Sequence, residues 1–116
     1  LINGQIPFLE RHIRRLHKGM HYLSYEAPES LNRETILSDI KQLELPEAAR
    51  IRLSVYRKAG GTYRPQSDQF DYIIEFSKLP HTTYHINEEG LKCGLFNTLS
   101  LQGNSLENFK TVNCLP

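Results

Sequence analysis

Apolar residues recur at every third or fourth position early in the chain and at every second position in its middle part. A spacing of three and four predicts an amphipathic helix from about Pro7 to Leu23, because residues so spaced share one helix face. Proline suits the first turn of a helix, where its missing N–H costs no hydrogen bond. The apolar face of this helix comprises Leu9, Ile13, Leu16, Met20 and Leu23.

The same periodicity predicts a second helix from about Asn32 to Leu43. The Asn32 side chain can accept a hydrogen bond from a free backbone N–H at the start of the helix, and Glu34 in the first turn complements the helix dipole. Pro46 marks the end of this segment. The apolar positions are Leu31, Ile36, Ile40 and Leu43.

Strict alternation then predicts two half-buried strands, Arg50–Tyr56 and Phe70–Phe76. The loop between them contains Gly60 and Gly61, which permit backbone angles that other residues avoid. A further strand is predicted to open at Lys92–Phe96. Helices followed by strands indicate an α+β fold.

The two ends of the chain indicate a piece of a longer protein. Asn3-Gly4 is a strong hairpin-turn pair, yet two residues alone precede it. The other end stops at Pro116 with no closing element. We therefore expect strand residues before Leu1 and further structure after Pro116.

Composition is that of a soluble globular segment. The 116 residues are 39% hydrophobic and 23% charged, about one domain's worth of chain. A formal charge of +1 provides no strong field for nucleic acid, and no apolar run approaches the roughly 20 residues that span a bilayer. We expect neither partner. Cys93 and Cys114 are isolated thiols, which predicts a reducing, cytoplasmic location.

One lysine near the end of the chain is a candidate nucleophile. Lys110 lies among Leu106, Phe109 and Val112, whose spacing predicts partial burial. Burial disfavours the charged ammonium, so the pKa of Lys110 is expected to fall and its free amine to become reactive. A solvated loop lysine is the alternative interpretation.

Arg15 is the candidate anion ligand on the first helix. It follows His12 by three positions and Phe8 by seven, which places it at the edge of the buried face. Gly19 lies four residues further on and leaves room beside it. The alternative is a solvent-facing arginine, one of four basic residues on this helix: Arg11, Arg14, Arg15 and Lys18.

The order of several motifs resembles the class IV family of pyridoxal-phosphate enzymes, also called fold type IV. The motifs are Glu10-x-His12-x-x-Arg15-Leu16 on the first helix, Arg57 followed by Gly60-Gly61-x-Tyr63-x-Pro65 after a strand, and Lys110-x-x-Asn113. The family includes branched-chain aminotransferases, D-amino-acid aminotransferases and aminodeoxychorismate lyase. Each motif alone is weak, but their order covers nearly the whole chain.

The resemblance implies roles for individual residues. Lys110 would hold pyridoxal 5'-phosphate as a Schiff base, and Arg15 would bind the cofactor phosphate. Arg57, Gly60 and Gly61 would lie toward the substrate. A guanidinium suits a phosphate because it donates two parallel hydrogen bonds, and a side-chain primary amine is required for an imine. No metal is implied.

The resemblance also implies the organisation and reaction. Residues 1–79 would be an incomplete small N-terminal α+β domain, 80–88 a linker, and 89–116 the truncated beginning of the large cofactor-binding domain. The reaction would transfer an amino group between an amino acid and a 2-oxo acid in a homodimer, with aminodeoxychorismate lyase as the alternative. The family's acidic partner for the pyridine nitrogen lies beyond this segment, so the fragment alone is expected to turn over little or nothing.

Two further interpretations concern the first helix. Its basic residues, with His12, His17 and His21, could meet RNA phosphates as a non-catalytic binding module. The near-zero net charge and the lack of an aromatic stacking motif argue against this. His17 and His21 have the spacing of a zinc pair, as do His81 and His85, but no third ligand is obvious and a surface role is the simpler interpretation.

Overall fold

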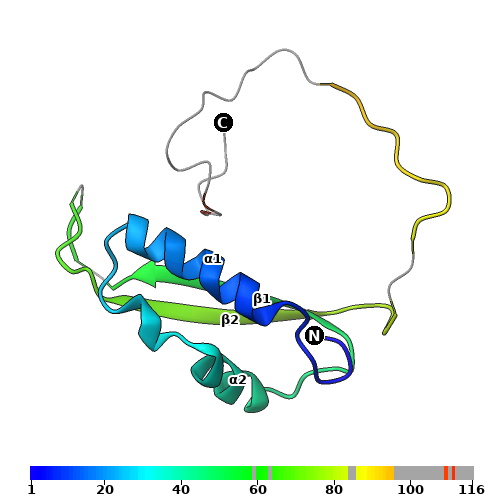
Figure 1. Cartoon of the computed structure of the whole chain (residues 1–116), viewed down its shortest axis with the longest axis horizontal. Helices are drawn as coiled ribbons and strands as arrows, with labels where there is room; N and C mark the ends of the chain where they lie inside the picture. The colour runs from blue at the N-terminus through cyan, green and yellow to red at the C-terminus, as the bar shows by residue number, and fades with distance from the viewer. Residues whose placement is uncertain (59, 63, 84–85, 96–108, 110, 112–116) are drawn as a thin grey trace.

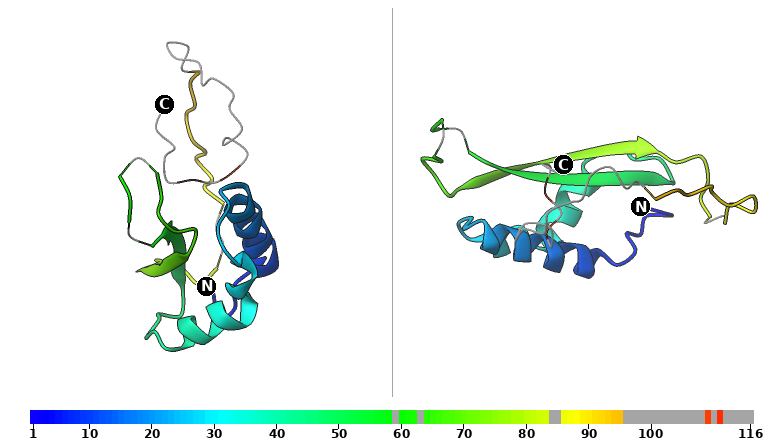
Figure 2. Two further views of the ribbon diagram at one scale, coloured as in Figure 1. Left: turned by 90° about the vertical axis from the view of Figure 1, so that its left-hand side faces the viewer. Right: turned by 90° about the horizontal axis from the view of Figure 1, so that it is seen from above.

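The computed structural model describes residues 1–58, 60–62, 64–83, 86–95, 109 and 111. Within these residues two helices pack on one face of a two-stranded sheet, an arrangement visible in both views of Figure 2. The α+β prediction is confirmed. The elements are α1 (Leu9–Tyr22), the 3₁₀ helix η1 (Pro28–Ser30), α2 (Arg33–Lys41), β1 (Ala49–Arg57) and β2 (Phe70–Lys78), as labelled in Figure 1.

Helix α1 begins two residues later than its predicted start at Pro7. The backbone of Phe8 has φ 58° and ψ 24°, a left-handed conformation that cannot continue into a right-handed helix. Pro7 therefore precedes the helix instead of occupying its first turn. The buried residues Leu9, Ile13 and Met20 belong to the predicted apolar stripe.

Helix α2 begins where its sequence predicted. Asn32 is the N-cap, and its side chain accepts a hydrogen bond from the Thr35 backbone N–H at 3.0 Å. The helix ends at Lys41, two residues before the predicted Leu43. Its buried residues are Ile36 and Ile40.

Strands β1 and β2 are antiparallel, and each extends beyond its predicted bounds. Leu53 pairs with Ile74 and Val55 with Tyr72, so their side chains point toward the helices. These side chains pack against a buried cluster of Leu9, Ile13, Leu31, Ile36 and Ile40. The opposite face of the sheet is polar apart from Tyr56 and Ile73.

The start of the chain lies beside the start of β1. Ile2 and Gln5 form a bridge around Asn3 and Gly4, whose φ angles of 48° and 76° confirm the predicted turn. Ile2 also bridges Ala48, and the amino group of Leu1 donates to the Ala49 carbonyl at 2.7 Å. These contacts hold the first residues of the chain against the start of β1.

The predicted strand at Lys92–Phe96 is wrong for residues 92–95, and Phe96 lies outside the described residues. A strand needs a neighbouring backbone to complete its hydrogen bonds, and the described part of the chain places none beside this segment. Ile86, Leu91 and Leu95 are accordingly 80%, 84% and 92% exposed. The proposed domain boundaries at residues 79 and 88 stay predictions.

A hydrogen bond ties α2 to β2 directly. The Tyr72 hydroxyl donates to Oδ2 of Asp39, which lies near the end of α2. This hydrogen bond, with smaller contributions from partial burial and the carboxylate charge, raises the pKa of Tyr72 above its ordinary value.

Because the pKa of Tyr72 is raised by folding, its contribution to stability is present below pH 10, the ordinary tyrosine pKa, and is lost as pH rises through the folded-state value. We expect Tyr72→Phe to lower the free energy of unfolding by about 1 kcal/mol at neutral pH and by less above pH 10. Urea unfolding between pH 7 and 11 measures this. Tyr56→Phe, on the opposite sheet face, is the control, and an equal loss in both variants would contradict the assignment.

Candidate functional site

The side of α1 that carries Arg15 lies apart from its buried stripe. Arg15, Gly19 and Tyr22 are separated by four and three positions, so they share one side of the helix. Arg15 is exposed. Its contact with His12, 3.4 Å from Nη2 to Nδ1, is longer than a good hydrogen bond, and no other described residue pairs with it. Most of its N–H donors therefore have no partner among the described residues.

A residue from the far end of the chain packs against this side of α1. The ring centroids of Phe109 and Tyr22 are 4.6 Å apart, with the ring planes inclined by 32°. A Cβ built on Gly19 would lie 3.7 Å from Phe109 Cδ1. The room that the sequence predicted beside Gly19 is taken by the Phe109 ring.

The remaining residues of the lysine motif are not described. Lys110 and Asn113 lie outside the described residues, as does Tyr63 of the glycine loop motif. Phe109 and Thr111 flank Lys110, and the Thr111 backbone N–H donates to the Phe109 carbonyl at 3.0 Å. Phe109 itself contacts α1 at Gly19, about one helical turn beyond Arg15.

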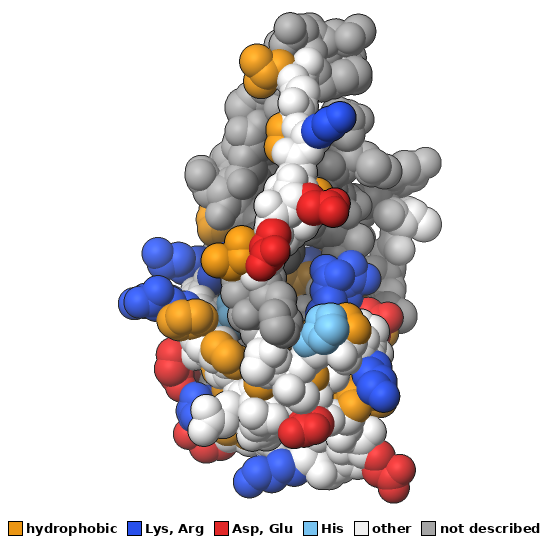
Figure 3. All heavy atoms as spheres, turned by 90° about the vertical axis from the view of Figure 1, so that its right-hand side faces the viewer, with side chains coloured by type: hydrophobic (Ala, Val, Ile, Leu, Met, Phe, Trp, Pro, Cys, Tyr) orange, Lys and Arg blue, Asp and Glu red, His pale blue; other side chains and the backbone are white. Residues whose placement is uncertain are grey.

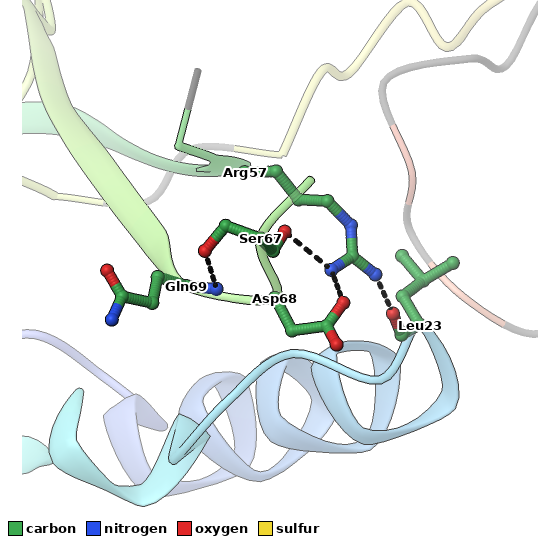
Figure 4. Close-up of polar contacts among 5 residues, drawn as sticks. All are labelled: Leu23, Arg57, Ser67, Asp68 and Gln69. Atoms are coloured by element: carbon green, nitrogen blue, oxygen red, sulfur yellow. Dashed lines mark hydrogen bonds and ion pairs between the residues drawn. The ribbon is translucent and has the colours of Figure 1, made fainter. Parts of the chain in front are cut away.

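Arg57 lies at the end of β1, and its guanidinium makes three hydrogen bonds. Its Nη1 donates to the Asp68 carboxylate and, at 3.4 Å, to the Ser67 carbonyl; its Nη2 donates to the Leu23 carbonyl, as Figure 4 shows. The guanidinium carbon lies 4.6 Å from the centroid of the Tyr25 ring.

These contacts join two distant parts of the chain. Leu23 is the C-cap of α1, where unpaired carbonyls and the helix dipole favour a cation. Asp68 belongs to the β1–β2 connection. Arg57 therefore holds the end of α1 against that connection, a role that the sequence analysis did not find. The predicted helix end at Leu23 could have indicated this role, because the last carbonyls of a helix need hydrogen-bond donors from elsewhere.

Gly60 and Gly61 are required by the backbone of the loop. Their φ angles are 132° and 85°, in the region that favours glycine. A Cβ on Gly61 would overlap the carbonyl oxygen of Arg64. The structure thus explains both glycines as turn residues, and their position toward the substrate stays a prediction.

The other side of α1 forms an open groove of about 420 Å³ against the start of α2. There His17 Nε2 donates to the Leu31 carbonyl at 3.0 Å, and His21 Nε2 lies 2.6 Å from Glu29 Oε1. A backbone hydrogen bond, followed by the hydrogen bond to His21, lowers the pKa of Glu29. The two histidines thus have separate partners, and the described residues contain no group of three metal-ligating side chains.

Basic side chains are distributed around α1 and do not form one patch. Arg14 and Lys18 line the groove, whereas Arg15 lies on the Phe109 side and Arg11 is placed over the Phe8 ring. On the face drawn in Figure 3, basic and acidic side chains intermingle. This distribution does not favour an RNA-binding surface. None of the described helices is long and apolar enough to cross a membrane.

Comparison with known families identifies the class to which this chain belongs. The family described as amino-transferase class IV matches residues 1–116. The chain therefore belongs to the class IV aminotransferase family, whose members are pyridoxal-phosphate-dependent enzymes. A search of curated proteins and a search of solved structures each found no match.

The described residues fit one part of such a cofactor. Arg15 offers a planar set of N–H donors on the side of α1 that Phe109 approaches, and phosphate oxygens accept such donors in pairs. Arg57 does not offer a free guanidinium, because its donors are directed to Asp68, Ser67 and Leu23.

We expect Arg57→Met to lower the free energy of unfolding by about 1.5–3 kcal/mol, because the Leu23 carbonyl and Asp68 lose a partly buried charged donor. Arg52→Met is the matched control on the same strand: Arg52 is 69% exposed and lies 4.0 Å from Glu75, so its loss should cost about 0–1 kcal/mol. Urea unfolding compares the two. Equal costs would show that the Arg57 contacts do not hold α1.

Proposed function

We propose that this chain belongs to an aminotransferase that transfers an amino group between an amino acid and a 2-oxo acid, with pyridoxal 5'-phosphate bonded to Lys110. The observation that carries the proposal is the contact of Phe109 with Gly19 and Tyr22. It brings the residue before Lys110 to the side of α1 that presents Arg15. Family membership over the whole chain supports the same conclusion.

The proposed division of labour follows from the chemistry of two side chains. Lys110 Nζ is a primary amine that can bond a carbonyl carbon and, once released, accept or return a proton at the substrate α-carbon. Arg15 donates hydrogen bonds to the phosphate and orients the cofactor. The cofactor, when bound, supplies the electron sink.

Arg57 and the Gly60-Gly61 loop are proposed to border the substrate. Since the Arg57 donors are occupied by Asp68 and Leu23, Arg57 would act by holding the loop and not by touching the substrate. We also propose that the enzyme is a homodimer in the cytoplasm, the latter from its isolated cysteines.

Aminodeoxychorismate lyase is the second candidate, because it would use the same lysine and phosphate ligand. Assays of amine transfer from L-branched-chain amino acids and D-alanine, and of pyruvate release from aminodeoxychorismate, distinguish the two reactions.

The assignment of Lys110 is tested on the full-length protein by adding pyridoxal phosphate, reducing with borohydride and mapping the modified peptide by mass spectrometry. We expect the label on Lys110, its loss in Lys110→Ala and its retention in Lys92→Ala, because Lys92 is exposed. A label on another lysine, or no label, would refute the proposal.

Arg15→Gln should weaken binding of pyridoxal phosphate by about 10- to 100-fold, the effect of losing one charged phosphate contact. Arg14→Gln is the matched control, since Arg14 is the neighbouring arginine on the groove side of α1. Cofactor titration followed by absorbance gives both dissociation constants. If the two variants bind equally well, Arg15 is not the phosphate ligand.

A further inference from the structure

Gly19 is an interior helix residue without a local reason to be glycine. Glycine destabilises a helix interior relative to alanine, and Gly19 has none of the left-handed φ angles that require glycine elsewhere in this chain. The described atoms that a Gly19 Cβ would meet within 4 Å are Cδ1 and Cβ of Phe109, at 3.7 and 3.9 Å. The surroundings of Gly19 are therefore defined by Phe109.

Tyr22 completes this contact surface one turn later. Its side chain is 47% exposed, although its ring lies 4.6 Å from that of Phe109 in a tilted arrangement that aromatic pairs favour. Gly19, which has no side chain, leaves space for the Phe109 ring, and the Tyr22 ring packs against it. Together they hold a planar side chain against the outside of α1.

The contact has a consequence for the neighbouring lysine. Consecutive Cα atoms are about 3.8 Å apart, so a chain held at residue 109 confines the start of residue 110 to that distance. Arg15 precedes Gly19 by four residues, about 6 Å along the helix axis. Holding residue 109 against Gly19 would therefore limit how far the next residue can move from the side of α1 that carries Arg15.

We infer that Gly19 and Tyr22 are positioning residues, which hold Phe109 and thereby set the separation between the Lys110 amine and the phosphate ligand Arg15. The inference rests on the proposed function. Gly19 and Tyr22 do not touch the reacting atoms in this scheme; they act through Phe109.

The tolerance of position 19 provides a graded test. An alanine methyl at 3.7 Å from the Phe109 ring is in ordinary van der Waals contact, so Gly19→Ala should retain the contact. Gly19→Val adds a Cβ that carries two methyl groups, and these should displace the Phe109 ring. Lys18→Val introduces the same β-branched residue on the groove side of α1 and controls for its effect on the helix. Tyr22→Ala removes the aromatic contact with Phe109, and Tyr22→Phe preserves it.

The first measurement needs no cofactor. In the full-length apoprotein, hydrogen exchange of the peptide containing Thr111 should be about 3- to 10-fold faster in Gly19→Val and Tyr22→Ala, which corresponds to loss of one aromatic contact. Gly19→Ala, Tyr22→Phe and Lys18→Val should exchange like the unaltered protein. Unchanged exchange in both disruptive variants would overturn the contact. Should Gly19→Val fail to fold, Tyr22→Ala and Phe109→Ala carry the test.

The second measurement detects positioning. In Gly19→Val and Tyr22→Ala we expect pyridoxal phosphate to attach about 3- to 10-fold more slowly. We also expect a shift in the pH at which the absorption of the bound cofactor changes. Tyr22→Phe should restore both properties. Faster exchange with unaltered attachment and pH dependence would refute the positioning role. If borohydride labels no Lys110 in the unaltered protein, the proposed function fails and the positioning role fails with it, whereas the exchange experiment still decides the contact itself.

Discussion

The packing of the α1 apolar stripe against one face of the β1–β2 sheet determines which of its other side chains can meet a ligand. Burial of Leu9, Ile13 and Met20 sets the rotation of the helix about its axis. Once this rotation is set, Arg15, Gly19 and Tyr22 lie on one outer side and His17 and His21 on the other. The first side meets Phe109, and the second lines the groove beside α2.

Arg57 stabilises this arrangement at the end of β1. A two-stranded sheet is marginally stable by itself and depends on the helices packed against it. By donating to the Leu23 carbonyl and to Asp68, Arg57 joins the end of α1 to the connection between the strands. The helix that presents Arg15 is thus held at its far end by a second arginine. The described contacts of Arg57 are thus structural ones, made to Leu23 and Asp68.

Much of the local structure could be predicted from the periodicity of apolar residues. The three- and four-residue spacing located both helices, and alternation located both strands, because each pattern reflects the geometry of one element. The start of α1 was predicted two residues too early because the left-handed backbone of Phe8 has no signature in its side chain. The expected strand after Asn87 was wrong over residues 92–95, since strand formation depends on a partner that the local sequence does not reveal.

For the candidate site too, one part could be predicted from the sequence and another depended on the tertiary structure. The identity and order of Arg15, Arg57, the two loop glycines and Lys110 predicted the family, because that chemistry is carried by residue types and their spacing. Which residues meet depended on the tertiary structure. Residues 19 and 109 are 90 positions apart by number, and Leu23 and Arg57 are separated by 34. Such contacts follow from the packing of whole elements, which no local pattern specifies. The sequence by itself therefore determined the elements and the available functional groups, and the fold decided that Phe109 lies on the Arg15 side of α1 and that Arg57 binds the end of that helix.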